Sequence, residues 1–145
     1  MNKKELRIIV AGSRDFKDYD LLQDTLMKFL SETDNTKVRF ISGMARGADT
    51  LGEQFASSHG YDVVRFPADW DGLGRKAGYI RNAEMAKYAS EEGSIGLLFA
   101  FWDGKSRGTM HMINLAKQHG LTVHVIDYKT EVTNEYDDRR TKKDC

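Results

Sequence analysis

Short, largely apolar runs recur along this chain, and each of the first four is followed by a stretch with helical spacing. Runs of this length and character are typical of strands that are buried on both faces of a sheet. Each run ends near a glycine, a proline or a polar turn, as expected where a strand stops. Five such runs predict strands at residues 7–10, 38–41, 62–66, 95–101 and 122–126.

Apolar side chains between these runs return at the spacing of an amphipathic helix, which places them on one face. The last of these stretches ends at Gly120. Strands and helices that alternate with short connections predict an α/β fold, here a Rossmann-like three-layer sandwich with a mainly parallel five-stranded sheet. The four helical patterns comprise Leu22, Leu26, Phe29 and Leu30; Ala48, Leu51, Phe55 and Ala56; Ile80, Met85 and Ala89; and Thr109, Met112, Ile113 and Ala116.

The chain of 145 residues is about the length of one domain. We expect this domain to span residues 1–127. Residues 128–145 differ from it, since they are polar, carry five basic and five acidic side chains, and show little periodicity. They predict a flexible C-terminal tail.

Charge and cysteine content narrow the class of protein. Lys and Arg number 22, as do Asp and Glu, so the formal net charge is zero. Binding to nucleic acid is therefore not expected, because it normally requires a basic excess. Cys145 is the one cysteine, which excludes an internal disulfide. With no apolar run of membrane-spanning length and no signal-peptide pattern, we expect a cytoplasmic protein without membrane contact.

Two polar clusters follow the first two predicted strands. Right-handed crossovers bring the carboxyl ends of parallel strands to one edge of the sheet, where ligands of such folds bind. The first cluster either contributes to a ligand site or forms an ordinary turn. In the second cluster, Asp49 either holds a ribose hydroxyl or orients Arg46, or it caps the helix. The predicted ligand-binding residues here are Gly12, Ser13 and Arg14, then Ser42, Gly43, Arg46, Gly47 and Asp49.

A third cluster lies in residues 67–85, which we expect to form a glycine-spaced loop leading into a helix. We expect Trp70 to stack on a base; the alternative is that it covers the core. We expect Arg81 and Asn82 to bind a sugar-phosphate; the alternative is that they are solvated residues on the surface of a helix. With Asp69, these residues complete the predicted contribution of this segment to the site.

A fourth cluster follows the fourth strand, and its glycine-rich turn into a helix suits a phosphate group. The spacing of a Walker A loop is absent, and so is a GxGxxG fingerprint. Each cluster alone is weak, but four at one edge predict a phosphate-binding pocket. Predicted binding residues in this cluster are Asp103, Ser106, Arg107, Gly108 and Thr109.

Other chemistry finds little support in the sequence. The four histidines are scattered and form neither an HExxH motif nor a cluster with cysteine. We therefore expect no metal site and no cofactor. A GxSxG motif is also absent, which argues against a nucleophilic hydrolase.

Taken together, the four clusters resemble the SLOG superfamily, and in particular its small YspA/YpsA-related branch from bacteria and phages. The matching segments are residues 11–16, 42–49, 66–85 and 101–116, within a similarity that covers about residues 7–126. The resemblance implies a Rossmann-like fold and the binding of a nucleotide or a nucleotide-derived signal by a sensor or sequestering protein. It also implies a homodimer or a larger homo-oligomer.

The Lonely Guy enzymes of the same superfamily cleave the N-glycosidic bond of nucleotides, and they suggest an alternative. Arg81 and Met85 match their RKxxM element, and residues 106–109 resemble their phosphate-binding turn. Their glutamate falls on Met112, which cannot transfer a proton. The alternative function is thus a nucleotide-processing hydrolase that cleaves an N-glycosidic or phosphate-linked bond, with Arg81 and Asp69 as its catalytic residues. DprA, which processes DNA, shares this superfamily, but the zero net charge argues against that function.

Overall fold

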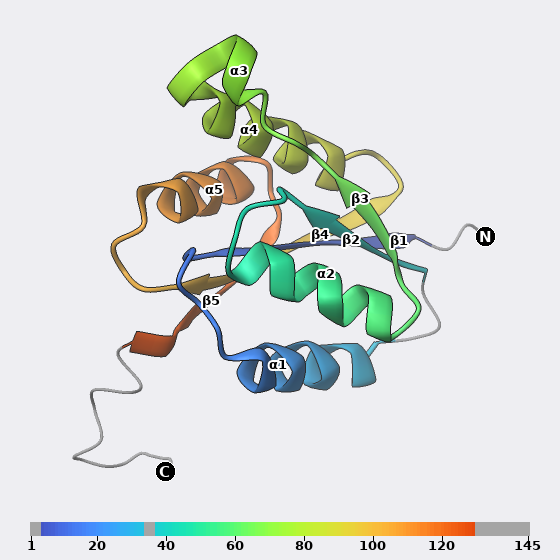
Figure 1. The fold of residues 1–145 in the computed structure, drawn as a ribbon. Coiled ribbons are helices and arrows are strands. Elements are labelled where there is room, and N and C mark those ends of the chain that lie inside the picture. The colour runs from blue at the N-terminus through green and yellow to red at the C-terminus, as the bar shows by residue number, and fades with distance from the viewer. Residues whose placement is uncertain (1–3, 34–36, 130–145) are drawn as a thin grey trace.

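The computed structural model describes residues 4–33 and 37–129. A five-stranded sheet with the order β3-β2-β1-β4-β5 lies at the centre (Figure 1). All four pairs of neighbouring strands are parallel, which confirms the α/β prediction. The strands are β1 (Glu5–Gly12), β2 (Val38–Ser42), β3 (Asp62–Arg65), β4 (Ser94–Trp102) and β5 (Thr122–Asp127).

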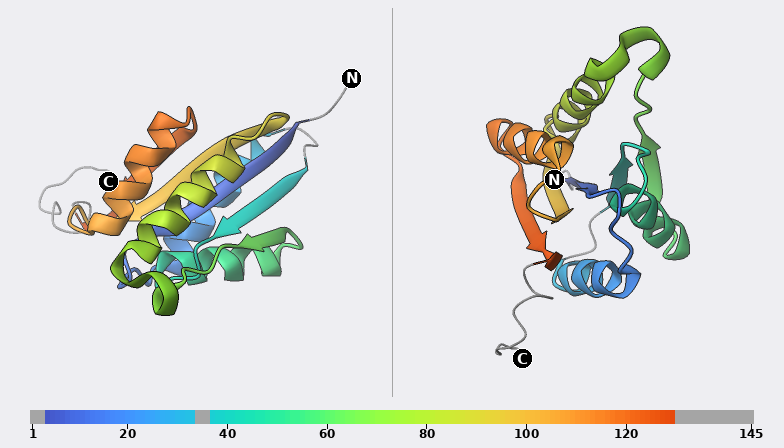
Figure 2. Two further views of the ribbon diagram at one scale, coloured as in Figure 1. Left: turned by 90° about the horizontal axis from the view of Figure 1, so that it is seen from above. Right: turned by 60° about the vertical axis from the view of Figure 1, so that its left-hand side comes forward.

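Helices cover both faces of the sheet as two outer layers (Figure 2). Helices α1 (Tyr19–Ser31) and α2 (Ala48–Ser58) pack on one face, where their apolar side chains meet Ile8, Val10 and Phe40. Helices α4 (Ala77–Ala89) and α5 (Arg107–Gln118) pack on the other face. The predicted three-layer sandwich is therefore confirmed.

The apolar runs predicted that all five strands are buried on both faces. The structure confirms this for the central strands. Strands β3 and β5 form the edges of the sheet, and Val125 of β5 is 44% exposed. The prediction was wrong for these two strands because an apolar run shows that a strand is packed but not which strands flank it.

The segment before α4 is more ordered than the predicted loop. It contains a short helix α3 (Trp70–Leu73) and a 3₁₀ turn η1 (Gly74–Lys76), which project beyond the sheet (Figure 1). Helix α4 starts at Ala77, so Arg81 lies in its second turn. Helices this short bury no apolar stripe, and periodicity therefore gave no sign of them.

The strand order places a topological switch point at β1 and β4. The chain leaves β1 toward β2 on one side, whereas β4 and β5 lie on the other side. Connections that diverge at neighbouring strands leave a crevice at their carboxyl ends. The first and fourth polar clusters flank this crevice.

Two further findings concern the ends of the chain and its helices. Within residues 4–33 and 37–129, no helix combines the length and apolar character needed to cross a membrane. The predicted tail, 128–145, lies outside the described residues except for Tyr128 and Lys129. The Tyr128 ring packs against Phe16 with 4.8 Å between ring centroids, and its hydroxyl donates to Asp15 at 3.0 Å.

Candidate functional site

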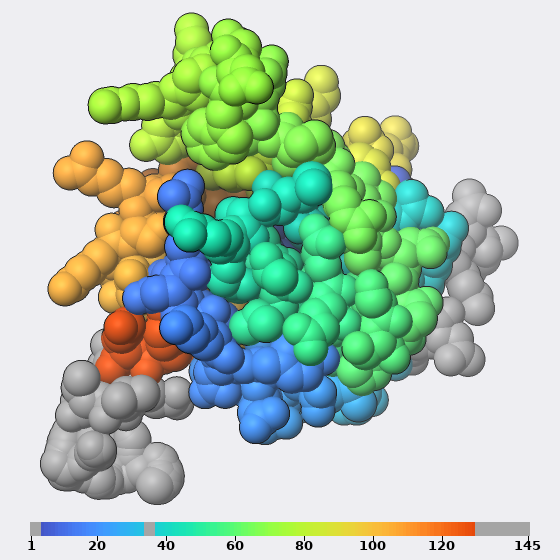
Figure 3. Space-filling model, viewed as in Figure 1, coloured from blue at the N-terminus to red at the C-terminus, as the bar shows by residue number. Residues whose placement is uncertain are grey.

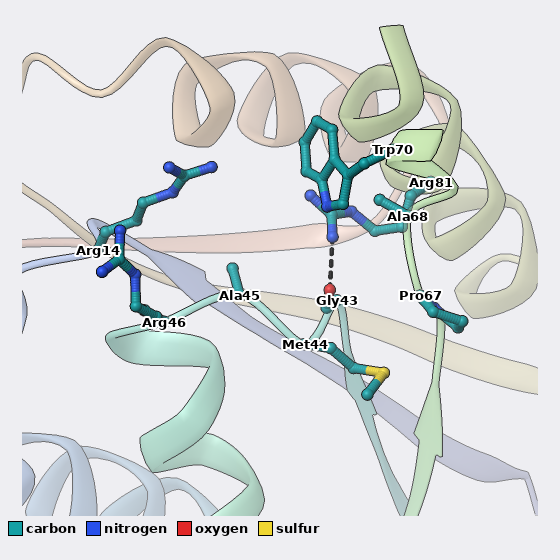
Figure 4. Close-up of a pocket in the computed structure, with 9 residues that line it drawn as sticks. All are labelled: Arg14, Gly43, Met44, Ala45, Arg46, Pro67, Ala68, Trp70 and Arg81. Atoms are coloured by element: carbon teal, nitrogen blue, oxygen red, sulfur yellow. Dashed lines mark hydrogen bonds between the residues drawn. The ribbon is translucent and has the colours of Figure 1, made fainter. Parts of the chain in front are cut away.

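A cavity of about 540 Å³ lies at the carboxyl ends of the strands and takes its walls from several distant parts of the chain. In Figure 3, the loop after β2 and the α3 segment come together on one face, beside the loop after β1. Three of the four arginines that the sequence singled out line this cavity. Its lining residues are Arg14, Gly43, Met44, Ala45, Arg46, Pro67, Ala68, Trp70 and Arg81 (Figure 4).

Arg14 and Arg46 form one wall, and Trp70 and Arg81 lie across from them (Figure 4). Arg14 follows β1, whereas Arg46 precedes α2, and both side chains are exposed. Within the part of the chain that the structure describes, no carboxylate forms an ion pair with either of them. Their guanidinium groups are therefore open to an anionic ligand.

Arg81 is held more firmly than the other two arginines. Its Nη1 donates to the Gly43 carbonyl, and its Nε donates to Asn82 Oδ1 at 3.0 Å. Burial lowers the pKa of Arg81; the carboxyl of Asp49 opposes this effect, and the charge of Arg14 adds to it. A cation that is partly desolvated beside another cation gains most from an anion, so this corner of the cavity favours negative charge.

Asp49, in the first turn of α2, is 5% exposed. Its Oδ2 accepts bonds from the amides of Gly43, at 3.2 Å, and Ala45, at 3.4 Å. Burial raises the pKa of Asp49 to about 7, although these bonds and Arg81 act in the opposite direction. The carboxyl therefore fixes the loop before α2, close to the capping role that the sequence offered as an alternative.

A smaller cavity of about 90 Å³ lies deeper and shares Arg14, Ala45 and Arg81 with the first. A third cavity, of about 380 Å³, opens between the loops after β1 and β4 and again includes Arg14. The inner cavity is lined by Ala11, Gly12, Arg14, Ala45, Asp49, Arg81, Asn82, Met85, Ser106, Gly108, Thr109 and Met112. The third is lined by Ser13, Arg14, Asp15, Asp103, Ser106 and Gly108.

Asp103 and Ser106 shape the turn that leads into α5. Asp103 Oδ1 accepts from the amides of Lys105 and Ser106, both at 2.8 Å. Although burial alone would raise it, these bonds hold the pKa of Asp103 below its usual value. Ser106 caps α5 by accepting from the Thr109 amide at 3.3 Å. Ser13 Oγ accepts from the Asp103 amide at 3.0 Å, which joins the loops after β1 and β4.

Asn82 of α4 joins this helix to α5. It is 6% exposed, and its Nδ2 lies 3.3 Å from the Gly108 carbonyl and 3.2 Å from His111 Nδ1. Trp70, in contrast, is 50% exposed and lines the 540 Å³ cavity, so it does not cover the core.

Four predicted residues line none of these three cavities. Asp69 is exposed and caps α3 by accepting from the Gly72 amide at 2.9 Å. Ser42 is buried and accepts from the Met44 amide at 3.0 Å. Gly47 has a φ of 79°, and a Cβ there would overlap the Ser13 carbonyl, so it serves the approach of two loops. Arg107 is the exposed first residue of α5.

Sequence reasoning missed several lining residues that carry no polar chemistry. Met44 has a φ of 64°, the one positive value at a non-glycine position in residues 4–33 and 37–129. Such a conformation is uncommon outside glycine and often marks a functional loop. Its place inside the second cluster was a signal, but backbone conformation cannot be inferred from the residue type. Ala45, Pro67 and Ala68 became visible only when the loops were brought together.

Comparison with known proteins identifies the family of this chain. A family model described as the YspA, cpYpsA-related SLOG family matches residues 6–72. The Gene 61 protein of Mycobacterium phage D29 is 33% identical over 122 residues, which cover 81% of this chain and 93% of that protein. No solved structure matches the chain. Together with the parallel sheet and the four clusters at its edge, these similarities show that the chain belongs to the YspA/cpYpsA-related SLOG family.

Proposed function

We propose that the 540 Å³ cavity binds a phosphate-bearing nucleotide or a nucleotide-derived signal, as part of a sensor or sequestering protein. The observation that carries this proposal is the meeting of Arg14, Arg46 and Arg81, from three separate segments, around a cavity with an exposed indole. The family to which the chain belongs is associated with nucleotide-related binding.

The chemistry of the walls supports this assignment. Arginine binds phosphate oxygens in a forked geometry, and two of these three guanidinium groups have no carboxylate partner in the described part of the chain. Trp70 offers a flat face on which a base can stack. The cavity volume lies within the range of about 300–1,000 Å³ that is usual for small-molecule sites.

The inner cavity gives a second place for a phosphate group. Its lining includes the start of α5, where backbone amides and the helix dipole favour an anion. A Cβ on Gly108 would meet no atom within 4 Å, so a ligand can approach the backbone there. The phosphates therefore run from the three arginines toward Gly108, with the base beside Trp70.

Thermal unfolding with a panel of AMP, ADP, NAD, ADP-ribose and cyclic nucleotides tests the proposal. A ligand present at 100 times its Kd stabilises the protein by about 2.7 kcal/mol. The double variant Arg14→Ala/Arg46→Ala should lose this stabilisation. Arg75→Ala should keep it, because Arg75 is exposed on η1 and lines none of the three cavities. A wild-type protein that none of these compounds stabilises would overturn the proposal.

One observation favours the second candidate function, a hydrolase acting on the N-glycosidic or phosphate-linked bond. The Asp49 carboxyl lies in the wall of the inner cavity near Arg81, and its pKa of about 7 suits proton transfer at neutral pH. It takes the place that the sequence gave to Asp69, which caps α3 instead. In this reaction water adds across the C1′–N bond of AMP and yields adenine and ribose 5-phosphate.

Chromatography after incubation with AMP separates the two functions. The hydrolase produces free adenine, and Asp49→Asn abolishes the product without abolishing AMP binding. Binding of AMP with no release of adenine by the wild-type protein would reject the hydrolase and leave the sensor.

A homodimer or larger homo-oligomer also remains part of the proposal. Exposed apolar side chains on α3, α4 and α5, among them Leu73, Ile80 and Met110, provide surface that association would remove from water. Light scattering should give at least twice the 16.5 kDa mass of one chain. A mass of one chain at micromolar concentration would contradict this expectation.

A further inference from the structure

Gly78 lies in the first turn of α4, where its backbone needs no glycine. Its conformation is helical, so any ordinary residue can adopt it. Glycine inside a helix is less favourable than alanine, because it loses more conformational freedom on folding. The presence of glycine at this position therefore calls for another cause, and the surrounding space provides one.

Two groups of the candidate site pack over Gly78. A Cβ added there would lie 3.2 Å from Trp70 Cη2 and 3.8 Å from Cζ3. The same Cβ would lie 3.6 Å from Nη2 of Arg81, which is one helical turn further along α4. The indole of Trp70 and the guanidinium of Arg81 thus converge on the one position of this turn that carries no side chain.

The Trp70 indole lies on an exposed part of the molecule. Trp70 opens the four-residue helix α3, which projects from the sheet and packs against η1 and α4 (Figure 1). Its side chain is half exposed, and it faces the wall formed by Arg14 and Arg46 across the cavity (Figure 4). The closer the indole lies to α4, the wider is the space between Trp70 and the wall formed by Arg14 and Arg46.

We propose that Gly78 is a positioning residue of this site: its missing side chain lets the Trp70 indole lie against α4 and leaves room for a flat heteroaromatic ring. The inference rests on the proposed nucleotide-binding function and deepens it. Gly78 acts through Trp70 on the ring of the ligand, whereas the phosphates depend on the arginines.

A series of larger side chains, Gly78→Ala and Gly78→Leu, tests this proposal. Both residues favour helix more than glycine, so both variants should unfold at a temperature equal to or above that of the wild type. ADP carries a base and pyrophosphate does not. Gly78→Leu should displace the indole and weaken its stacking on the base, so this variant should bind ADP about tenfold more weakly. Pyrophosphate binding should weaken less than ADP binding, because only Arg81 of the three arginines lies beside Gly78.

Two comparisons separate positioning from a general structural effect. Trp70→Ala should weaken ADP binding to a similar extent, and Gly78→Leu should add no further loss in that background. Asn114→Leu, on the exposed face of α5, adds the same side chain away from the three cavities and should leave both affinities unchanged. Equal losses for ADP and pyrophosphate in Gly78→Leu would overturn the proposal.

Fluorescence gives a readout that needs no ligand. Acrylamide quenching of Trp70, obtained by subtracting the signal of the matching Trp70→Phe protein, should increase from wild type to Gly78→Ala to Gly78→Leu. Unchanged quenching across the series would refute the packing of the indole on Gly78, even where no nucleotide binds. Absence of ADP and pyrophosphate binding by the wild type, with quenching that follows the series, would instead reject the binding function alone.

Discussion

Glycines that look alike in the sequence have different roles at the site. A Cβ on Gly12 would overlap the Phe101 carbonyl and approach Ala48 Cβ to 2.8 Å, because β1, β4 and α2 meet there. A Cβ on Gly108 would meet open space. Gly12 is therefore required for packing, whereas Gly108 leaves room beside the start of α5.

The pair Gly12→Ala and Gly108→Ala tests this difference. Overpacking should destabilise Gly12→Ala by about 1–3 kcal/mol or more. Gly108→Ala should raise the free energy of unfolding by about 0.5–1 kcal/mol, because alanine suits a helix better than glycine. Urea denaturation measures both values, and equal effects of the two substitutions would contradict the packing argument.

The raised pKa of the buried Asp49 carboxyl should make the stability of the protein depend on pH. Its pKa in the folded protein is about 7, whereas a carboxyl in an unfolded chain ionises near 4. Between these values the folded state binds the proton and the unfolded state does not, so the contribution of Asp49 to stability falls as pH rises. The slope is at most about 1.4 kcal/mol per pH unit.

Asp49→Asn should remove this dependence. The free energy of unfolding of the wild type, relative to the variant, should decrease from pH 4.5 to pH 7. Asp69→Asn, which removes an exposed carboxylate, serves as the control. Parallel profiles for wild type and Asp49→Asn would show that Asp49 ionises in the folded protein as it does in the unfolded chain.

At the scale of elements, the loop that carries Arg14 is supported from the far end of the chain. Phe16 stacks on Phe101 with 5.0 Å between ring centroids, and the Tyr128 ring meets Phe16 edge-on at 4.8 Å. The Tyr128 hydroxyl also bonds to Asp15. The residue that follows β5 thereby holds the loop after β1, two strands away in the sheet.

Tyr128→Ala should therefore affect both stability and binding. Loss of this partly buried ring should lower the free energy of unfolding by about 1–2 kcal/mol, less than for a fully buried aromatic side chain. Because the Arg14 loop loses a support, affinity for ADP should fall as well. Lys117→Ala, at an exposed position of α5 that lines none of the three cavities, is the control. Wild-type ADP affinity in Tyr128→Ala would show that the loop holds its position without the ring.

For the whole molecule, charge is balanced overall but uneven locally. The formal net charge is zero, while Arg14, Arg46 and Arg81 gather at one cavity. A compact group of cations suits a small anion, whereas a nucleic acid backbone requires an extended basic surface.

We therefore expect ADP to bind more weakly as salt increases, because these arginines are partly exposed and salt screens them. Duplex DNA should not be retained in a gel shift at 50 mM salt. Isothermal titration at increasing salt checks the first expectation. Retention of DNA at micromolar protein would contradict the second and favour a nucleic-acid function.

Much of the fold could be predicted because burial leaves a periodic trace. The apolar runs located all five strands, and helical spacing located the four long helices. The α3 segment left no such trace, since its side chains are exposed. Of the predicted site residues, Arg14, Arg46, Arg81 and Trp70 lie at one cavity, while Asp69 and Arg107 lie outside the three cavities. Their role in ligand binding stays a prediction. Spacing places a residue after a strand, but it does not say where the side chain points.

By itself, the sequence determined the alternation of strands and helices and the polar turns at one edge of the sheet, because both follow from local patterns of burial. Tertiary structure alone decided which strands lie at the edges, which arginines share a cavity, and why Gly12 and Gly78 carry no side chain. Each of these depends on atoms from segments far apart in the chain. Their distances are set by packing, which no local pattern contains.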